Sequence, residues 1–194
     1  MDRYYIEAFL ARHAGDIRGR VLEVAEDTYT RRFGGERVMQ SDVLHVWPDN
    51  PRATIIADLT HADHIPSESF DCVILTQTLQ FIYDVRAAAR TLYRILRPGG
   101  VLATFPGICQ IIRYDMDRWG DYWRLTSLAA RRLFEEALPP AGVRVEAYGN
   151  VLAAIAFLHG LGAEELRREE LDHRDPDYEV SITVRAVKPE AEAR

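Results

Sequence analysis

Cysteine and long apolar runs are scarce in this sequence of 194 residues, and its positive charges are outnumbered by negative ones. Its two cysteines, Cys72 and Cys109, lie in apolar segments and form no metal-type pair, so we expect reduced core thiols rather than a disulfide framework. No apolar run reaches the roughly 18 residues of a membrane-spanning helix, and the opening segment MDRYYIEAFL does not have the features of a signal peptide. These absences favour a cytoplasmic protein.

The net charge of −6 gives no electrostatic reason to expect nucleic acid or an anionic membrane as a partner. The 47% of hydrophobic residues is ordinary for a soluble protein, and the length suits one domain. We expect a single domain over residues 1–189 and a frayed tail at 190–194. The apolar segment 151–163 either covers a site or forms a dimer contact, so a monomer and a homodimer both stay open.

Short apolar runs alternate with helical patterns through most of the chain, which is typical of βαβ units and a parallel sheet. The clearest helix has Asp84 as its N-cap and ends before Pro98-Gly99-Gly100. Residues 113–126 predict a loop, after which Ser127 caps another helix. The last run alternates strictly, which predicts an antiparallel strand with one face in water. The predicted strands are 21–24, 37–41, 53–59, 70–76, 101–105, 143–148 and 178–187, and the predicted helices are 3–14, 85–96 and 127–138.

Glycine is missing where a nucleotide-binding fold normally needs it. The stretch GRVLEVAEDTYTRRFGG (19–35) begins with a buried strand that ends in a carboxylate, Glu23, and a tight turn into a helix should follow. That turn is AEDTY (25–29), in which every residue carries a Cβ atom. Carboxylates also end the next two predicted strands, at Asp42 and Asp58.

These features resemble the class I S-adenosylmethionine-dependent methyltransferases. The most specific segment is HIPSESFDCVILTQTLQFIYDVRAAARTLYRILRPGGVLATFPG (64–107), which is similar to the family's LP…SFD strand and its helix ending in LKPGG. The later DYWRLTSLAARRLFEE resembles a YWRFT segment found in a subset of these enzymes. The resemblance implies an α/β, Rossmann-like three-layer sandwich with a mostly parallel seven-stranded sheet and an antiparallel C-terminal strand. It also implies S-adenosyl-L-methionine as the cofactor, held by a degenerate glycine motif.

The resemblance assigns cofactor roles to the residues that match the family's motifs. Glu23 matches the acid beneath the methionine end, and Asp42 matches the acid that binds the ribose hydroxyls. Their spacing of 19 residues also agrees with the expectation that an acid about 20 positions on reaches a ribose. Asp58 and Leu59 match the pair that holds adenine. The other matches are Ala25 at the first glycine position, and Thr76 and Gln77 in the turn after the fourth strand.

The aromatic segment 113–126 follows the fifth strand, at the sheet edge where α/β proteins bind their ligands. Two interpretations stay open for it, a wall against the substrate and ordinary core packing. Its arginines either recognise an acidic substrate or form solvated ion pairs. His159 is a candidate general base, with a core or lid role as the alternative, and we expect no metal site. The candidate substrate residues are Tyr114, Trp119, Tyr122, Trp123 and Arg124.

The first functional hypothesis is an S-adenosylmethionine-dependent methyltransferase that acts on a small-molecule or glycan-like acceptor. Methyl transfer depends on the alignment of nucleophile, methyl carbon and sulfur more than on covalent help from the protein. The alternative is a protein of the same fold that no longer transfers methyl groups and serves as a binding module or rearranges a bound substrate. A nicotinamide-dependent oxidoreductase is disfavoured because no Gly-x-Gly-x-x-Gly follows a predicted strand.

Overall fold

A single sheet organises the molecule, with its strands in the order β3-β2-β1-β4-β5-β7-β6. The structure is a computed structural model that describes residues 1–106 and 113–190, and for residues 99, 101–106, 113 and 114 it describes the backbone alone. The five strands from β3 to β5 are parallel, and β7 runs antiparallel to both β5 and β6. The strands are β1 (Gly19–Val24), β2 (Val38–His45), β3 (Ile55–Ile56), β4 (Phe70–Thr76), β5 (Leu96–Pro106), β6 (Val143–Tyr148) and β7 (Ser181–Lys188).

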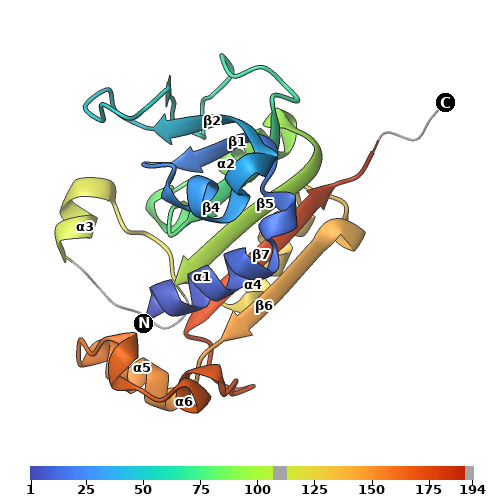
Figure 1. Ribbon diagram of the computed structural model, residues 1–194. Helices are drawn as coiled ribbons and strands as arrows, with labels where there is room; N and C mark the ends of the chain where they lie inside the picture. The colour runs from blue at the N-terminus through green and yellow to red at the C-terminus, as the bar shows by residue number, and fades with distance from the viewer. Residues whose placement is uncertain (107–112, 191–194) are drawn as a thin grey trace.

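Helices cover both faces of this sheet, and Figure 1 shows α1 in front of it. Neighbouring residues of β1 point to opposite faces, so Val21 packs in the cluster beneath α1, while Leu22 packs in the larger cluster that includes α2 and α4. The predicted α/β, Rossmann-like arrangement is confirmed. The helices are α1 (Asp2–Arg12), α2 (Val85–Ile95), α3 (Arg113–Trp119), α4 (Ser127–Glu135), α5 (Val151–Leu158) and α6 (Arg168–Asp172).

The shorter helical turns connect these elements. Five are 3-10 turns and one, directly after the β1 turn, has π-helical hydrogen bonding. They comprise Ala14–Asp16, Thr30–Gly34 (the π-helical turn), Gly35–Arg37, Leu79–Phe81, Pro140–Gly142 and Ala163–Glu165. In the described part of the chain, no helix is both long enough and apolar enough to cross a membrane.

Helix α2 follows the sequence closely. The side chain of Asp84 accepts a hydrogen bond from the backbone N–H of Ala87 at 2.9 Å, which confirms the predicted N-cap. The inner stripe of the helix is buried against the sheet. Its end differs from the prediction, because β5 begins directly at Leu96 rather than after the Pro98-Gly99-Gly100 segment.

Three further predictions about the secondary structure are wrong. Residues 113–119 form α3 instead of a loop. The cap of α4 is Thr126, whose hydroxyl accepts from the N–H of Ala129 at 3.2 Å, while the N–H of Ser127 donates to the carboxylate of Glu179. Strand β2 continues to His45, so Asp42 does not end it.

The last strand was expected to have one face in water, and this expectation is wrong. Strand β7 begins at Ser181, and both Ser181 and Thr183 are only 1% exposed. Helix α1 contacts β7 and covers its polar side. The alternation of polar and apolar residues in β7 therefore places small polar side chains beneath α1 and not in water.

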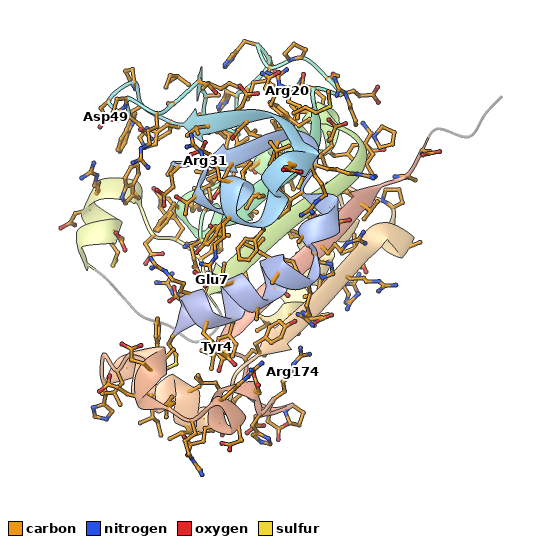
Figure 2. The ribbon with its side chains drawn as sticks, in the orientation of Figure 1. Tyr4, Glu7, Arg20, Arg31, Asp49 and Arg174 are labelled. Atoms are coloured by element: carbon orange, nitrogen blue, oxygen red, sulfur yellow. The ribbon has the colours of Figure 1, made fainter. Side chains whose placement is uncertain are left out.

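Helices α5 and α6 lie together at one end of the molecule, next to the N-terminus (Figure 1). The hydroxyl of Tyr4 in α1 donates to the carboxylate of Asp172 at 2.6 Å. The guanidinium of Arg174 lies over the ring of Tyr148, 4.0 Å from its centroid, and Figure 2 shows Tyr4 and Arg174 at this junction. These contacts join the C-terminal helices to α1 and β6.

Cys72 is a free, fully buried thiol, and burial raises its pKa. A thiol with a raised pKa is a poor nucleophile, which agrees with the predicted core role. Cys109 lies outside the described residues.

Candidate active site

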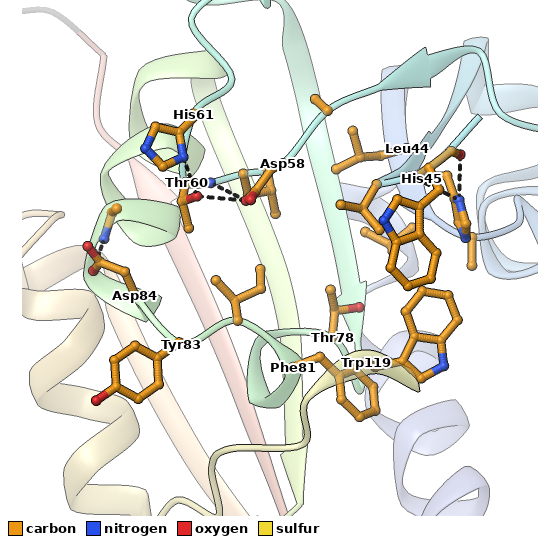
Figure 3. Close-up of a pocket in the computed structure, with 18 of the residues that line it drawn as sticks. Leu44, His45, Asp58, Thr60, His61, Thr78, Phe81, Tyr83, Asp84 and Trp119 are labelled. Atoms are coloured by element: carbon orange, nitrogen blue, oxygen red, sulfur yellow. Dashed lines mark hydrogen bonds between the residues drawn. The ribbon is translucent and has the colours of Figure 1, made fainter. Parts of the chain in front are cut away.

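A cavity of about 680 Å³ opens at the carboxyl ends of β1, β2 and β4. The strand order reverses between β1 and β4, and such a reversal point is where open α/β sheets bind ligands. Figure 3 shows Asp58, Thr60 and His61 on one side of the cavity, Tyr83 and Asp84 on another, and His45 with Trp119 at one end. The lining is completed by Val24, Ala25, Leu44, Val46, Trp47, Ala57, Leu59, Thr76, Gln77, Thr78, Phe81, Ile82, Ala87 and Tyr122.

The turn after β1 keeps a glycine-like backbone without a glycine. Ala25 has φ of 70°, in the left-handed region that residues with a Cβ rarely adopt. Its N–H donates to the carbonyl of Leu44 at 2.9 Å, and its carbonyl accepts from the side-chain amide of Asn50 at 2.7 Å. Hydrogen bonds on both sides of the residue therefore hold this conformation, and Ala25 lines the cavity.

Glu23 lies beneath the same turn and does not line the cavity. It is 2% exposed, and its carboxylate accepts from the backbone N–H groups of Tyr29 and Thr30 at 3.2 and 2.7 Å. Burial raises the pKa of Glu23 to about 7, although the hydrogen bonds from Thr30 and Tyr29 act in the opposite direction. In this structure the carboxylate supports the turn from behind.

The raised pKa of Glu23 predicts a pH-dependent stability. A carboxyl group with a higher pKa in the folded state stabilises the fold fully below its ordinary pKa, and that contribution is lost as the pH rises through about 7. We expect Glu23→Gln, which cannot ionise, to lose less free energy of unfolding than the parent between about pH 5 and pH 8. Urea denaturation of both proteins at the two pH values measures the difference, and equal losses would contradict the assignment.

Asp42 lies inside β2, away from the cavity lining. It is 6% exposed, and its oxygens accept from the guanidinium of Arg20 at 2.7 Å, the amide of Gln40 at 3.0 Å and the hydroxyl of Thr54 at 3.0 Å. The prediction that this carboxylate ends its strand is wrong, because β2 continues to His45. Its contacts are those of a buried structural ion pair.

Three aromatic side chains meet beyond the end of β2. The rings of Trp47 and Trp119 stack with centroids 4.7 Å apart, and the ring of His45 lies edge-on to both. Trp119 comes from α3, so this cluster joins the predicted substrate segment to the sheet edge (Figure 3).

Asp58 and Leu59 both line the cavity after β3. The exposed carboxylate of Asp58 accepts from the N–H and the hydroxyl of Thr60, both at 2.8 Å, and the Thr60 hydroxyl lies 2.7 Å from Nδ1 of His61. These bonds orient Asp58 at the cavity (Figure 3). Nε2 of the neighbouring His64 lies 3.2 Å from the carbonyl oxygen of Ile56.

The turn after β4 also faces the cavity through Thr76 and Gln77. Gln77 has φ of 49°, a second left-handed residue with a side chain. Two neighbouring parallel strands thus each end in an unusual turn at the cavity, and unusual backbone of this kind clusters at functional sites.

The aromatic segment is only partly at the cavity. Trp119 and Tyr122 line it, whereas Trp123 stacks on Tyr83 at 5.8 Å and donates its indole N–H to the carbonyl of Ile82 at 3.0 Å. Arg124 forms a double hydrogen bond with the carboxylate of Asp121, at 2.6 Å each. Arg124 therefore forms an ion pair, as one of the two interpretations expected, and its role toward a substrate stays a prediction. The side chain of Tyr114 lies outside the described part of the chain.

The structure does not bring His159 to the cavity. His159 follows the last turn of α5, is exposed, and does not contribute to the lining. The sequence did not point to most of the other lining residues, among them His45, Trp47, Tyr83 and Asp84. His45 and Trp47 could have been found from the apolar run VLHVW, which directly follows Asp42. This run extends the strand, so that the strand ends three residues after Asp42.

Comparison with known proteins agrees with this fold. Residues 13–104, just under half of the chain, match a family model described as a methyltransferase domain. A malonyl-[acyl-carrier protein] O-methyltransferase of Yersinia pestis is 25% identical over 155 residues, which cover 70% of this chain and 56% of that protein. The chain thus spans little more than half of this curated relative.

Solved methyltransferases share the fold. Phosphoethanolamine N-methyltransferase 2 of Haemonchus contortus, in complex with S-adenosyl-L-methionine, aligns with a TM-score of 0.62 and 15% identity over 96% of this chain and 53% of that one. An S-adenosylmethionine-dependent methyltransferase of Archaeoglobus fulgidus aligns with a TM-score of 0.61 and 12% identity over 96% and 94%. The resemblance to class I methyltransferases is confirmed by the fold and by the family match. The predicted cofactor is the ligand of the Haemonchus protein.

Proposed function

We propose that this chain, with its class I methyltransferase fold, binds S-adenosyl-L-methionine in the cavity and transfers the methyl group to a small-molecule acceptor. The observation that carries the proposal is the left-handed Ala25 at the β1 turn, beside the cavity and at the reversal of strand order. That backbone conformation is otherwise costly for alanine. Its retention without glycine supports a ligand-binding role for the turn.

The charges at the cavity suit this cofactor. S-adenosylmethionine supplies a methyl group on a cationic sulfonium, and it also carries an ammonium. In the described part of the chain the lining contains two aspartates and two histidines, and it contains no lysine or arginine. A cationic ligand therefore meets no like charge from the lining, whereas a pyrophosphate cofactor would find no cationic side chain there.

The acceptor side is apolar and aromatic. Phe81, Ile82, Tyr83 and Tyr122 line the part of the cavity near the start of α2. Because the described lining has no lysine or arginine, a neutral acceptor, either a small molecule or a glycan-like hydroxyl compound, fits better than an anionic one. We therefore do not propose an acidic acceptor such as the malonyl group in the name of the Yersinia protein.

The alternative is a protein that binds ligand without methyl transfer, and the comparisons do not favour it. Titration with S-adenosylmethionine and S-adenosylhomocysteine, followed by a screen for methyl transfer to neutral hydroxyl and amine compounds, tests the proposal. Binding with transfer supports it. Binding without transfer to any acceptor would favour the alternative, and no binding by folded protein would reject both the cofactor and the reaction.

The carboxylate of Asp58 is expected to accept a hydrogen bond from the adenine amino group of the cofactor. Asp58→Asn keeps an oxygen for Thr60 but exposes an N–H group to the ligand's amine, so a favourable acceptor is replaced by a second donor. We expect cofactor affinity to fall by about 1–3 kcal/mol. Calorimetry measures this loss. The control is Asp63→Asn, which removes a neighbouring exposed charge that does not line the cavity. An equal loss of cofactor affinity in this variant would mean that the effect comes from general electrostatics.

A further inference from the structure

We infer that His45 takes the place of a carboxylate as the residue that binds the ribose hydroxyls of the cofactor, an inference that rests on the proposed function. The sequence assigned this role to Asp42. That carboxylate is buried and already accepts from Arg20, Gln40 and Thr54. The residue at the carboxyl end of β2, and at the cavity, is His45.

The strand register puts His45 between the two other cofactor contacts. Leu44 pairs with Val24 at the end of β1 and accepts from the N–H of Ala25, so the β1 turn lies beside this end of β2. On the other side His45 pairs with Ile56, two residues before Asp58. A ligand whose methionine end lies at Ala25 and whose adenine lies at Asp58 has its ribose over β2.

The hydrogen bonds of His45 orient its ring. Nδ1 lies 2.8 Å from the carbonyl oxygen of Trp47, closer than the 3.3 Å to the Trp47 N–H. The carboxylate of Asp49 lies 3.5 Å from the same nitrogen. Two oxygen acceptors favour a proton on Nδ1, which leaves Nε2 of the neutral ring as an acceptor. Among the residues that the structure describes, none forms a hydrogen bond or an ion pair with Nε2 of His45.

Packing holds this orientation. The side chain of His45 is 11% exposed. Its ring lies edge-on to Trp47, with centroids 6.4 Å apart, and to Trp119, with centroids 5.8 Å apart. A ring fixed in this way presents a preorganised acceptor, which a hydroxyl of the ligand can use without further ordering of the side chain.

The test compares two ligands on matched variants. The ligands are S-adenosylhomocysteine and its 2′,3′-dideoxy analogue, and affinity is measured by calorimetry. We expect the parent to prefer the natural ligand by about tenfold, the contribution of one good hydrogen bond. His45→Leu should lose most of this preference by weakening S-adenosylhomocysteine alone, and His45→Gln, which retains an acceptor, should restore part of it. His64→Leu, at an exposed histidine outside the lining, is the control.

The outcomes separate the inference from the proposed function. If His45→Leu weakens both ligands equally, His45 only shapes the cavity and the inference is wrong. An unchanged preference in His45→Leu, with a lost preference in folded Asp42→Asn, would return the role to Asp42. Failure of the parent to bind either ligand would overturn the proposed function itself.

Discussion

Ala25→Leu is expected to lower the affinity for S-adenosylmethionine by about 100-fold or more, which corresponds to about 2.7 kcal/mol. The β1 turn lines the cavity, and its backbone is held by hydrogen bonds to Leu44 and Asn50. The turn therefore resists moving away, and a larger side chain must occupy space that the ligand needs. The rest of the fold should be retained, because Ala25 is exposed and packs in no core cluster.

Ala25→Gly is the matched variant, and two effects on its stability oppose each other. Glycine has more backbone entropy to lose on folding, which alone predicts a modest loss of stability. At φ of 70°, however, alanine is strained and glycine is not. We expect Ala25→Gly to gain about 0.5–1 kcal/mol of stability and to bind the cofactor at least as well as the parent.

Calorimetry and thermal denaturation on the parent, Ala25→Gly and Ala25→Leu measure both effects. If folded Ala25→Leu binds like the parent, the β1 turn is not against the ligand. A lower melting temperature for Ala25→Gly would show that the left-handed conformation of Ala25 is not strained.

Asp42→Ala is expected to destabilise the fold by about 2–4 kcal/mol, because removing one partner of a buried ion pair leaves the other uncompensated. Arg20 would lose its carboxylate, and the hydroxyl of Thr54 and the amide of Gln40 would lose an acceptor. The side chain of Arg20 is 32% exposed and reaches water in part, which keeps the expected loss below that of a fully buried pair.

Cofactor affinity should stay within about twofold of the parent in Asp42→Ala, since twofold is only about 0.4 kcal/mol. Urea denaturation measures the loss of stability, and calorimetry at a temperature where the variant is folded measures affinity. Asp63→Ala removes an exposed carboxylate as a control. A large loss of affinity with unchanged stability would restore the ribose role that the sequence suggested for Asp42.

The sequence predicted best where burial and periodicity agree. Strands β4 and β6 occupy the predicted residues, and Asp84 caps α2 as expected. In these elements a run of apolar residues is bounded by turn or capping residues, so local signals are sufficient.

Tertiary partners explain the rest. A carboxylate is rarely buried unless it is paired, so Asp42 was interpreted as a strand end, and its partner Arg20 is 22 residues away in the sequence. The covered polar face of β7 depends on α1, at the other end of the chain. The left-handed conformation of Ala25 depends on Asn50 and Leu44. None of these contacts produces a local pattern.

The most direct test of the central claim is a calorimetric titration of the intact protein with S-adenosylmethionine, with circular dichroism to show that the protein is folded. We expect saturable binding of one ligand per chain with a dissociation constant of about 100 µM or tighter, within the range in which enzymes usually bind their substrates. Competition by S-adenosylhomocysteine should follow, because both ligands use the same cavity. Folded protein that gives no binding heat at about millimolar ligand, and no displacement signal in competition, would contradict the account.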